Sequence, residues 1–433
     1  MASEVEREVS VKGSRAIRLG LLARISLFLA VMGPGMITGI VDDDPTGIAG
    51  YSIAGARFGY SLLWAIVLCF FALAIIAEMA ARLGAITGKG LGDLIRERFG
   101  VRITSLAMLV LLVANATTTI AEFAGVAGAS EIFGVSKYIT VPLAAALVLA
   151  VVIYGTYHRV EKVLLVGSLV FVCYIITGFL ARPDWGSVAT HSVVPTFHFT
   201  LPYLTILIGV IGTTITPWQQ FYLQSGVVDK GLGEREYRFE RWDVYAGAFA
   251  CTLIAFFVIV TTAATLNAHG QPADTVTDVG QALHPLAGDF AANLFAIGLL
   301  NASLLAATVL PLSTAYAVCG AFGWERSVTR RLREAPAFYG LFAALIVIGT
   351  AAVLMPGLPL LVLMFLPNVV GGILLPVILV LMLKLVNDRR IMGRWTNSPR
   401  QNAVAWATTV VIIVLAAVYA VIAGLQAAGI VHG

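Results

Sequence analysis

The chain has 433 residues, of which 59% are hydrophobic and only 12% are charged. About a quarter of the residues of a soluble domain are charged, so this composition excludes an ordinary soluble protein and indicates a surface that mostly faces lipid. The formal net charge of +4 is small, and no nucleic-acid partner is expected from it.

Eleven apolar segments are long enough to cross a bilayer, which takes about 20 residues of helix. The alternating pattern of a membrane barrel is absent, and helices satisfy their own backbone in lipid. The sequence therefore predicts an all-α integral membrane protein that begins with a tail at residues 1–20. The expected spans are residues 21–57 (interrupted), 61–82, 103–129, 137–157, 162–181, 199–228 (interrupted), 243–267, 286–319, 336–355, 359–385 and 402–428.

The basic residues fall unevenly between the two sets of loops. Of the 28 lysines and arginines, only Arg57, Lys137 and Arg182 belong to the second set. Because loops rich in Lys and Arg stay in the cytoplasm, the sequence predicts a cytoplasmic N-terminus and, after eleven crossings, an extracellular C-terminus. The expected location is the plasma membrane.

The first apolar segment is interrupted in its middle by Asp42, Asp43 and Asp44, followed directly by Pro45. Proline removes a backbone donor and clashes with the preceding turn, so the helix is expected to break here. An ionised carboxylate at bilayer depth costs at least ~3 kcal/mol and indicates a functional site. Asp42 and Asp43 could instead lie at the water-facing end of a short half-helix, which leaves Asp44 as the strongest candidate.

The sixth segment carries a second interruption, formed by Gly212, Thr213, Thr214, Thr216 and Pro217. Either break alone could be an ordinary kink, because proline and glycine are common in membrane helices. Two breaks five helices apart are typical of an inverted-repeat transporter with its site at the midplane. The repeats would span residues 21–181 and 199–385, with helix 402–428 added.

The other charged residues within the spans include Glu78, Arg82 and Glu122. Glu78 and Arg82 are four residues apart and are expected to pair on one helix face, as a structural or gating pair. Glu122 has no local partner and could line a cavity. No histidine falls in the middle of a span, so no histidine proton relay is expected.

Several motifs resemble those of the Nramp family of metal-ion transporters. They are GPGMITGIVDDDPTG (33–47), ARLGAITGKGLGDLIRERFG (81–100), IAEFAG in the third segment, and NDRRIMG (387–393). The resemblance implies a LeuT-type fold, with a 5+5 inverted repeat, one extra helix, and segments 1 and 6 unwound at the midplane. It also implies import of divalent metal ions. The chain would then be no enzyme and would need no cofactor, since the ion is the substrate.

The departures from the family pattern concern the ligands. Asp44 is kept, but Thr46 and Gly47 replace the family's glycine and asparagine. In segment 6, Thr216 and Trp218 replace a methionine and a histidine. This pattern resembles the Nramp-related magnesium transporter branch.

Two further departures lie in segments 3 and 10. Thr119 and Glu122 stand where the family has two acidic residues, and Asn368 stands where it has a glutamine. The resemblance thus leaves one acid in segment 3 and an amide in segment 10.

The remaining groups predict a loose site made of oxygen ligands. Methionine sulfur suits transition metals, whereas carboxylate, carbonyl, hydroxyl and water suit Mg²⁺ and Mn²⁺. Asp44 would be the principal ligand, small residues would leave room for retained waters, and Asp43 would raise the cation concentration at an entrance. The predicted site residues are Asp44, Asp43, Gly47, Thr216, Asn368 and the carbonyls near Val41 and Thr213.

The predicted function is import of Mg²⁺, and also Mn²⁺, by alternating access. Proton coupling is not expected, because Trp218 and Thr119 remove two titratable groups, although Glu122 could still accept a proton. Alternatives are a proton-coupled transition-metal importer, a LeuT-type amino-acid transporter, a cation channel and a membrane enzyme. An aspartate at the break would repel an amino acid's carboxylate, no repeated pore loop is present, and no catalytic triad is recognisable.

Overall fold

The computed structural model describes residues 33–154, 157–271, 273–326 and 332–427, and every regular element in these ranges is a helix. The first half of the chain forms α3 (Pro34–Val41), α4 (Pro45–Phe58), α5 (Leu63–Thr87), α6 (Leu91–Ile132), α7 (Lys137–Ile153), α8 (Tyr157–Gly167), α9 (Val172–Leu180) and α10 (Trp185–Val193). The second half forms α11 (Leu201–Thr214), α12 (Pro217–Asp229), α13 (Tyr237–Thr265), α14 (Val276–Gln281), α15 (His284–Ala287), α16 (Ala291–Phe322), α17 (Pro336–Leu354), α18 (Leu360–Val386), α19 (Arg389–Met392) and α20 (Pro399–Ala427).

These helices account for the eleven predicted spans. Nine helical segments of the described ranges are long and apolar enough to cross a membrane, and α7 is a shorter apolar helix. The broken pair α3 and α4 supplies the remaining span. The predicted tail, the beginning of the first span and residue 428 lie outside the described residues.

Some boundaries differ from those predicted. The third span was expected from residue 103, but α6 begins at Leu91 and bends at Gly100, which has a positive φ of 79°. The residues between Leu91 and the bend are amphipathic rather than uniformly apolar, so a search for apolar runs misses them. The seventh span likewise begins at Tyr237, ahead of the apolar run, because charged residues form its first two turns.

Both predicted interruptions are present. The first lies between α3, which ends at Val41, and α4, which begins at Pro45. The second lies between α11, which ends at Thr214, and α12, which begins at Pro217. In both cases a proline occupies the first helical position, where its missing N–H costs nothing.

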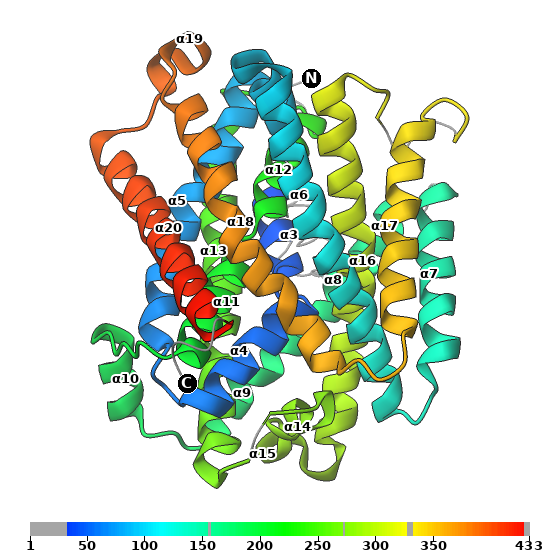
Figure 1. Cartoon of the computed structure of the whole chain (residues 1–433), viewed down its shortest axis with the longest axis vertical. Coiled ribbons are helices and arrows are strands. Elements are labelled where there is room, and N and C mark those ends of the chain that lie inside the picture. The colour runs from blue at the N-terminus through cyan, green and yellow to red at the C-terminus, as the bar shows by residue number, and fades with distance from the viewer. Residues whose placement is uncertain (1–32, 155–156, 272, 327–331, 428–433) are drawn as a thin grey trace, which may run out of the picture.

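The loops that carry most of the lysines and arginines meet at one end of the bundle. Figure 1 shows α19 at that end and α10, α14 and α15 at the other. Arg98 pairs with Asp388 at 2.6 Å and Arg326 with Asp93 at 2.7 Å, which joins α6 to two distant loops. Arg57 is one of the three basic residues of the other set of loops. It lies at the C-terminal end of α4 and pairs with Asp274, in the loop before α14.

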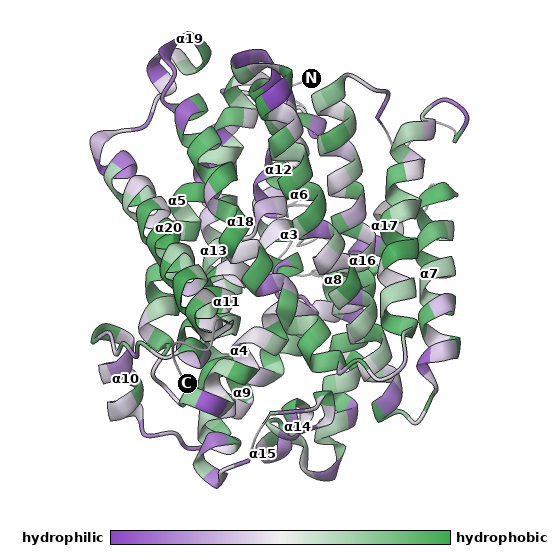
Figure 2. Ribbon diagram, viewed as in Figure 1, coloured by the Kyte–Doolittle hydropathy of each residue, from purple (hydrophilic) through white to green (hydrophobic). Residues whose placement is uncertain are grey.

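The hydropathy pattern agrees with a membrane bundle. Figure 2 shows hydrophobic residues along the middle of the outer helices α7, α17 and α20, while hydrophilic residues gather mainly toward the two ends. Large apolar side chains on these helices are exposed, among them Leu143 and Val421. Such an apolar belt is stable in lipid.

The half-helix α3 lies against α13 with almost no side chain between them. A Cβ on Gly247 would come within 2.2 Å of the Gly35 carbonyl oxygen, and one on Gly39 would lie 2.4 Å from the Gly247 oxygen. Small residues allow membrane helices to approach this closely. The packing of α3 on α13 therefore depends on backbone-to-backbone contact.

Asp243, on α13, caps the N-terminal end of α3. Its carboxylate accepts hydrogen bonds from the backbone N–H groups of Gly33 (3.0 Å), Gly35 (2.8 Å) and Met36 (3.1 Å). A carboxylate at a helix N-terminus satisfies unpaired donors and faces the positive end of the helix dipole. The two contacts together fix the position of α3.

Replacing Gly247 with alanine is expected to destabilise the protein by about 1–3 kcal/mol, the usual cost of overpacking, because the new methyl group would meet backbone that cannot rotate away. The control is Gly340→Ala on α17, where nothing lies within 4 Å of the added Cβ. Thermal unfolding in detergent should show a lower midpoint for Gly247→Ala only. Equal midpoints would contradict the close contact.

Candidate functional site

The Asp44 side chain is held in place by the helix that it precedes. It is the N-cap of α4, and its Oδ1 accepts hydrogen bonds from the N–H groups of Thr46 (2.7 Å) and Gly47 (2.9 Å) and from the Thr46 hydroxyl (2.5 Å). Asp is a favoured N-cap because its oxygen satisfies donors that the helix leaves unpaired. All three bonds use the same oxygen, so the carboxylate is fixed at one oxygen while the other is not used by the cap.

The break in segment 6 lies directly opposite. The Thr213 hydroxyl is 3.3 Å from the Thr46 hydroxyl, and the Tyr51 hydroxyl is 2.9 Å from that of Thr214. The Thr216 hydroxyl lies 3.5 Å from Asp42 Oδ1. The structure thus brings the two interruptions together, but it places Thr213 beside the Asp44 cap and Thr216 beside Asp42.

Asn368, on α18, joins this group. Its amide Nδ2 donates to the carbonyl oxygen of Thr46 at 2.7 Å. A Cβ on Gly50 would lie 2.7 Å from that nitrogen, and one on Gly212 would lie 2.1 Å from the backbone oxygen of Asn368. Glycines on α4 and α11 therefore let α18 approach both broken helices, and Asn368 secures the first turn of α4.

Gly47 supports the site through its backbone. Its N–H supports the Asp44 carboxylate, and a Cβ there would lie 3.0 Å from the Asp42 carbonyl oxygen and 3.3 Å from the Tyr51 ring. A larger side chain at Gly47 would therefore meet backbone and an aromatic ring, and the expectation that this small residue leaves room for water stays a prediction. Val41 is the last residue of α3, where the carbonyls have no following turn to bond, so its role as a carbonyl ligand stays a prediction.

Asp42 and Asp43 do not lie at a water-filled entrance. Both are buried, at 1% and 2% exposure. Asp42 accepts a hydrogen bond from the Cys251 thiol at 3.3 Å, because α13 covers the end of α3. Neither oxygen of Asp43 has a hydrogen-bond partner among the described residues. The prediction of an exposed cation-collecting role is therefore wrong for the conformation described.

The structure adds Glu122 to the site. This residue of α6 is fully buried near Asp44, and neither of its carboxylate oxygens has a hydrogen-bond partner among the described residues. The approach depends on Gly125, one turn further along α6, where a Cβ would lie 2.7 Å from the Pro45 ring and 2.3 Å from the Ser303 hydroxyl. The sequence marked Glu122 as an unpaired intramembrane acid, but its distance along the chain from Asp44 hid the contact.

The assembled site consists of oxygen groups. Carboxylates come from α6 and the first break, hydroxyls from Thr46 and Thr213, and an amide from Asn368. In the described ranges, no three Asp, Glu, His or Cys side chains converge as metal ligands. Two carboxylates placed together in a buried site require a cation or a proton to balance them, so the chemistry suits a hard cation held partly by carbonyls, hydroxyls and water.

Comparison with known proteins agrees with this architecture. The family described as "Natural resistance-associated macrophage protein-like", or Nramp, matches residues 35–422. The "Divalent metal cation transporter MntH" of Ralstonia nicotianae is 30% identical over 419 residues, which cover 92% of each chain. The protein of the same name from Verminephrobacter eiseniae is 28% identical and covers 92% of this chain and 90% of its own.

Solved structures show the fold. The Eremococcus coleocola manganese transporter, solved with an aromatic bis-isothiourea compound, has a TM-score of 0.72 at 20% identity and covers 90% of this chain and 86% of its own. Mhp1, a nucleobase-cation-symport-1 family transporter, has a TM-score of 0.58 at 15% identity, with 92% of both chains covered. The predicted LeuT-type fold is confirmed, and the chain belongs to the Nramp family.

Proposed function

We propose that the protein is a divalent metal cation transporter that imports Mg²⁺, and also Mn²⁺, by alternating access. Its relatives are named as transporters of divalent metal cations rather than as enzymes, and its structural neighbours include a manganese transporter. The distribution of basic loops supports a cytoplasmic N-terminus and an extracellular C-terminus in the plasma membrane.

The observation that carries the proposal is the state of the Asp44 carboxylate. It is buried at the junction of two broken helices, and one oxygen is anchored by three hydrogen bonds. Such anchoring removes the need to reorganise the carboxylate when an ion arrives. The surrounding groups are hydroxyls and carbonyls, which favour Mg²⁺ and Mn²⁺ over softer metals.

Replacing Asp44 separates its two roles. Asp44→Asn keeps an oxygen that can cap α4 but removes the charge, so the protein should stay folded while affinity for Mn²⁺ falls at least about 100-fold, beyond the 10–100-fold effect of losing a supporting residue. Asp44→Ala should lose both binding and the cap, which is worth about 1 kcal/mol. Titration calorimetry measures the affinity for Mn²⁺, proteoliposome uptake measures transport, and thermal unfolding measures the loss of the cap.

The matched control for the Asp44 variants is Asp274→Asn, at an exposed ion pair far from the site. It should bind and transport like the wild type. Wild-type uptake by Asp44→Asn would show that Asp44 is a helix cap and not a ligand.

Selectivity should follow from the absence of a methionine thioether among the proposed ligands. The unmodified protein should transport Mg²⁺ and Mn²⁺ and show no strong preference for Zn²⁺. Thr216→Met introduces a thioether at the second break and should increase inhibition of Mg²⁺ uptake by Zn²⁺ by about tenfold. Thr216→Val, which removes the hydroxyl without adding sulfur, is the control. Strong Zn²⁺ preference in the unmodified protein would overturn this assignment.

Membrane potential alone supplies enough energy for Mg²⁺ uptake. One charge falling through 100 mV releases about 2.3 kcal/mol, so a divalent ion gains roughly 4.6 kcal/mol. At about 1.4 kcal/mol per tenfold concentration ratio, this allows the ion concentration inside to exceed that outside by about three powers of ten. Trp218 occupies the segment 6 position where the resemblance places a histidine, and it is buried. We therefore propose uptake without proton coupling.

Proteoliposomes loaded with a pH-sensitive dye test this directly. With an inside-negative potential, Mg²⁺ or Mn²⁺ should enter without metal-dependent acidification. The second candidate function, proton-coupled import, is favoured by the position of Glu122 beside Asp44. Acidification that scales with metal uptake and disappears in Glu122→Gln would establish that alternative and reject the uncoupled mechanism.

A further inference from the structure

A cavity of about 700 Å³ lies at the α19 end of the bundle, away from the metal site. It is bounded by the first part of α6, the C-terminal end of α18, and the beginnings of α19 and α20. Figure 1 shows α18 running between α6 and α20, and α18 contacts both. The cavity therefore opens where three membrane helices reach the bilayer surface.

The cavity carries an excess of positive charge. Its walls include Arg98, Lys384 and Arg389. Arg98 pairs with Asp388 at 2.6 Å. Lys384 and Arg389 are exposed, and within the ranges that the structure describes neither makes an ion pair or a side-chain hydrogen bond. Two cations are thus available to a ligand.

Asp388 neutralises only one of the three cations. The N–H of Arg390 donates to its carboxylate at 2.9 Å, and this hydrogen bond, supported by Arg98, holds the pKa of Asp388 below its ordinary value. The carboxylate therefore stays ionised at cellular pH, and the cavity keeps a formal excess of two positive charges.

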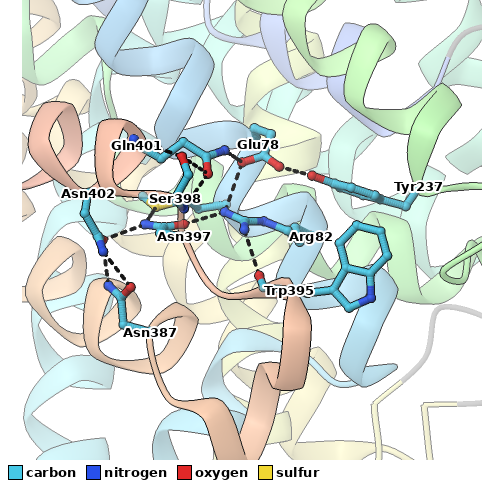
Figure 3. Close-up of polar contacts among 10 residues, drawn as sticks. Glu78, Arg82, Tyr237, Asn387, Trp395, Asn397, Ser398, Gln401 and Asn402 are labelled. Atoms are coloured by element: carbon cyan, nitrogen blue, oxygen red, sulfur yellow. Dashed lines mark hydrogen bonds and ion pairs between the residues drawn. The ribbon is translucent and has the colours of Figure 1, made fainter.

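A hydrogen-bonded polar network borders the cavity through Asn387 and Asn402. Asn387 and Asn402 exchange two hydrogen bonds, of 2.8 and 2.9 Å, and Asn397 donates to Asn402 at 3.0 Å. Figure 3 shows the network continuing to the buried Arg82, which bonds Asn397 and pairs with Glu78 at 3.2 Å. The predicted pairing of Glu78 with Arg82 is confirmed, and it anchors this network.

Apolar stripes lead from the cavity toward the middle of the membrane. On α20, Trp406 lines the cavity, and Val410 and Val414 follow it at four-residue intervals, with 51% and 53% exposure. Residues spaced in this way share one helix face. On α18, Ile373 is exposed three helical turns from Lys384. Tryptophan at the end of such a stripe is typical of the bilayer interface.

We propose that this cavity binds the headgroup of an anionic membrane phospholipid. Lys384 and Arg389 would contact the phosphate, and the acyl chains would lie along the stripe that begins at Trp406. Basic pockets between membrane helices bind such headgroups. The exposed apolar residues Val410 and Val414 beyond Trp406 favour a lipid over a free phosphate ion, which would use the cations alone.

Native mass spectrometry of the purified protein, titrated with single lipids, tests the proposal. Wild-type protein should bind phosphatidylglycerol more tightly than zwitterionic phosphatidylcholine. At about 1 kcal/mol for each cation, Lys384→Gln with Arg389→Gln should weaken phosphatidylglycerol binding about 30-fold. Lys384→Arg with Arg389→Lys keeps both charges and should bind like the wild type, which shows that the two positive charges are what the lipid requires, and an unchanged unfolding midpoint of the Gln variant shows that it is folded.

The matched control removes two cations from the loop end of α13, Arg235→Gln with Arg238→Gln, both exposed and outside the cavity. It should bind phosphatidylglycerol normally. If this control weakened phosphatidylglycerol binding equally, the effect would come from the general surface charge, and the proposed lipid site would be rejected. Equal binding of phosphatidylcholine, or glycerol phosphate binding as tight as that of phosphatidylglycerol, would overturn the lipid assignment.

Discussion

The structure depends on one constraint, which is that backbone groups inside a bilayer must find partners within the protein. Each unpaired group costs several kcal/mol in lipid, so a broken helix at the midplane persists only where other groups replace the missing bonds. Asp44 caps the first turn of α4 at the first break, and Asn368 bonds the carbonyl of Thr46 in that turn. These two residues therefore support the break and also belong to the candidate site.

This repair links the ion site to the rest of the fold. Glycines on α4, α6 and α11 allow α6 and α18 to approach the broken segments. Glu122 reaches Asp44 only because Gly125 permits α6 to lie against Pro45. Glycines far apart in the chain therefore determine that Asp44 and Glu122 lie close together, and the two carboxylates determine that the site suits a cation.

The sequence predicted the helices and the two interruptions well, because apolar length and proline position are local properties. It also predicted the Glu78–Arg82 pair, whose members are one turn apart. It did not predict that Asp42 and Asp43 would be buried, since the covering surface comes from α13. Nor could it show that Thr213, rather than Thr216, lies beside the Asp44 cap, because helix rotation is set by packing between distant segments.

The glycine contact between α3 and α13 has a consequence for the speed of opening. Interlocked side chains must leave their rotamer wells before two helices can separate, and each such change adds to the barrier. At the seam formed by Gly35, Gly39 and Gly247 the contacts are mainly between backbone atoms, with the Val244 side chain beside Gly35. Separation of α3 would break the three hydrogen bonds to Asp243 and the bond between Cys251 and Asp42, so hydrogen bonds rather than interlocked side chains would set most of the barrier.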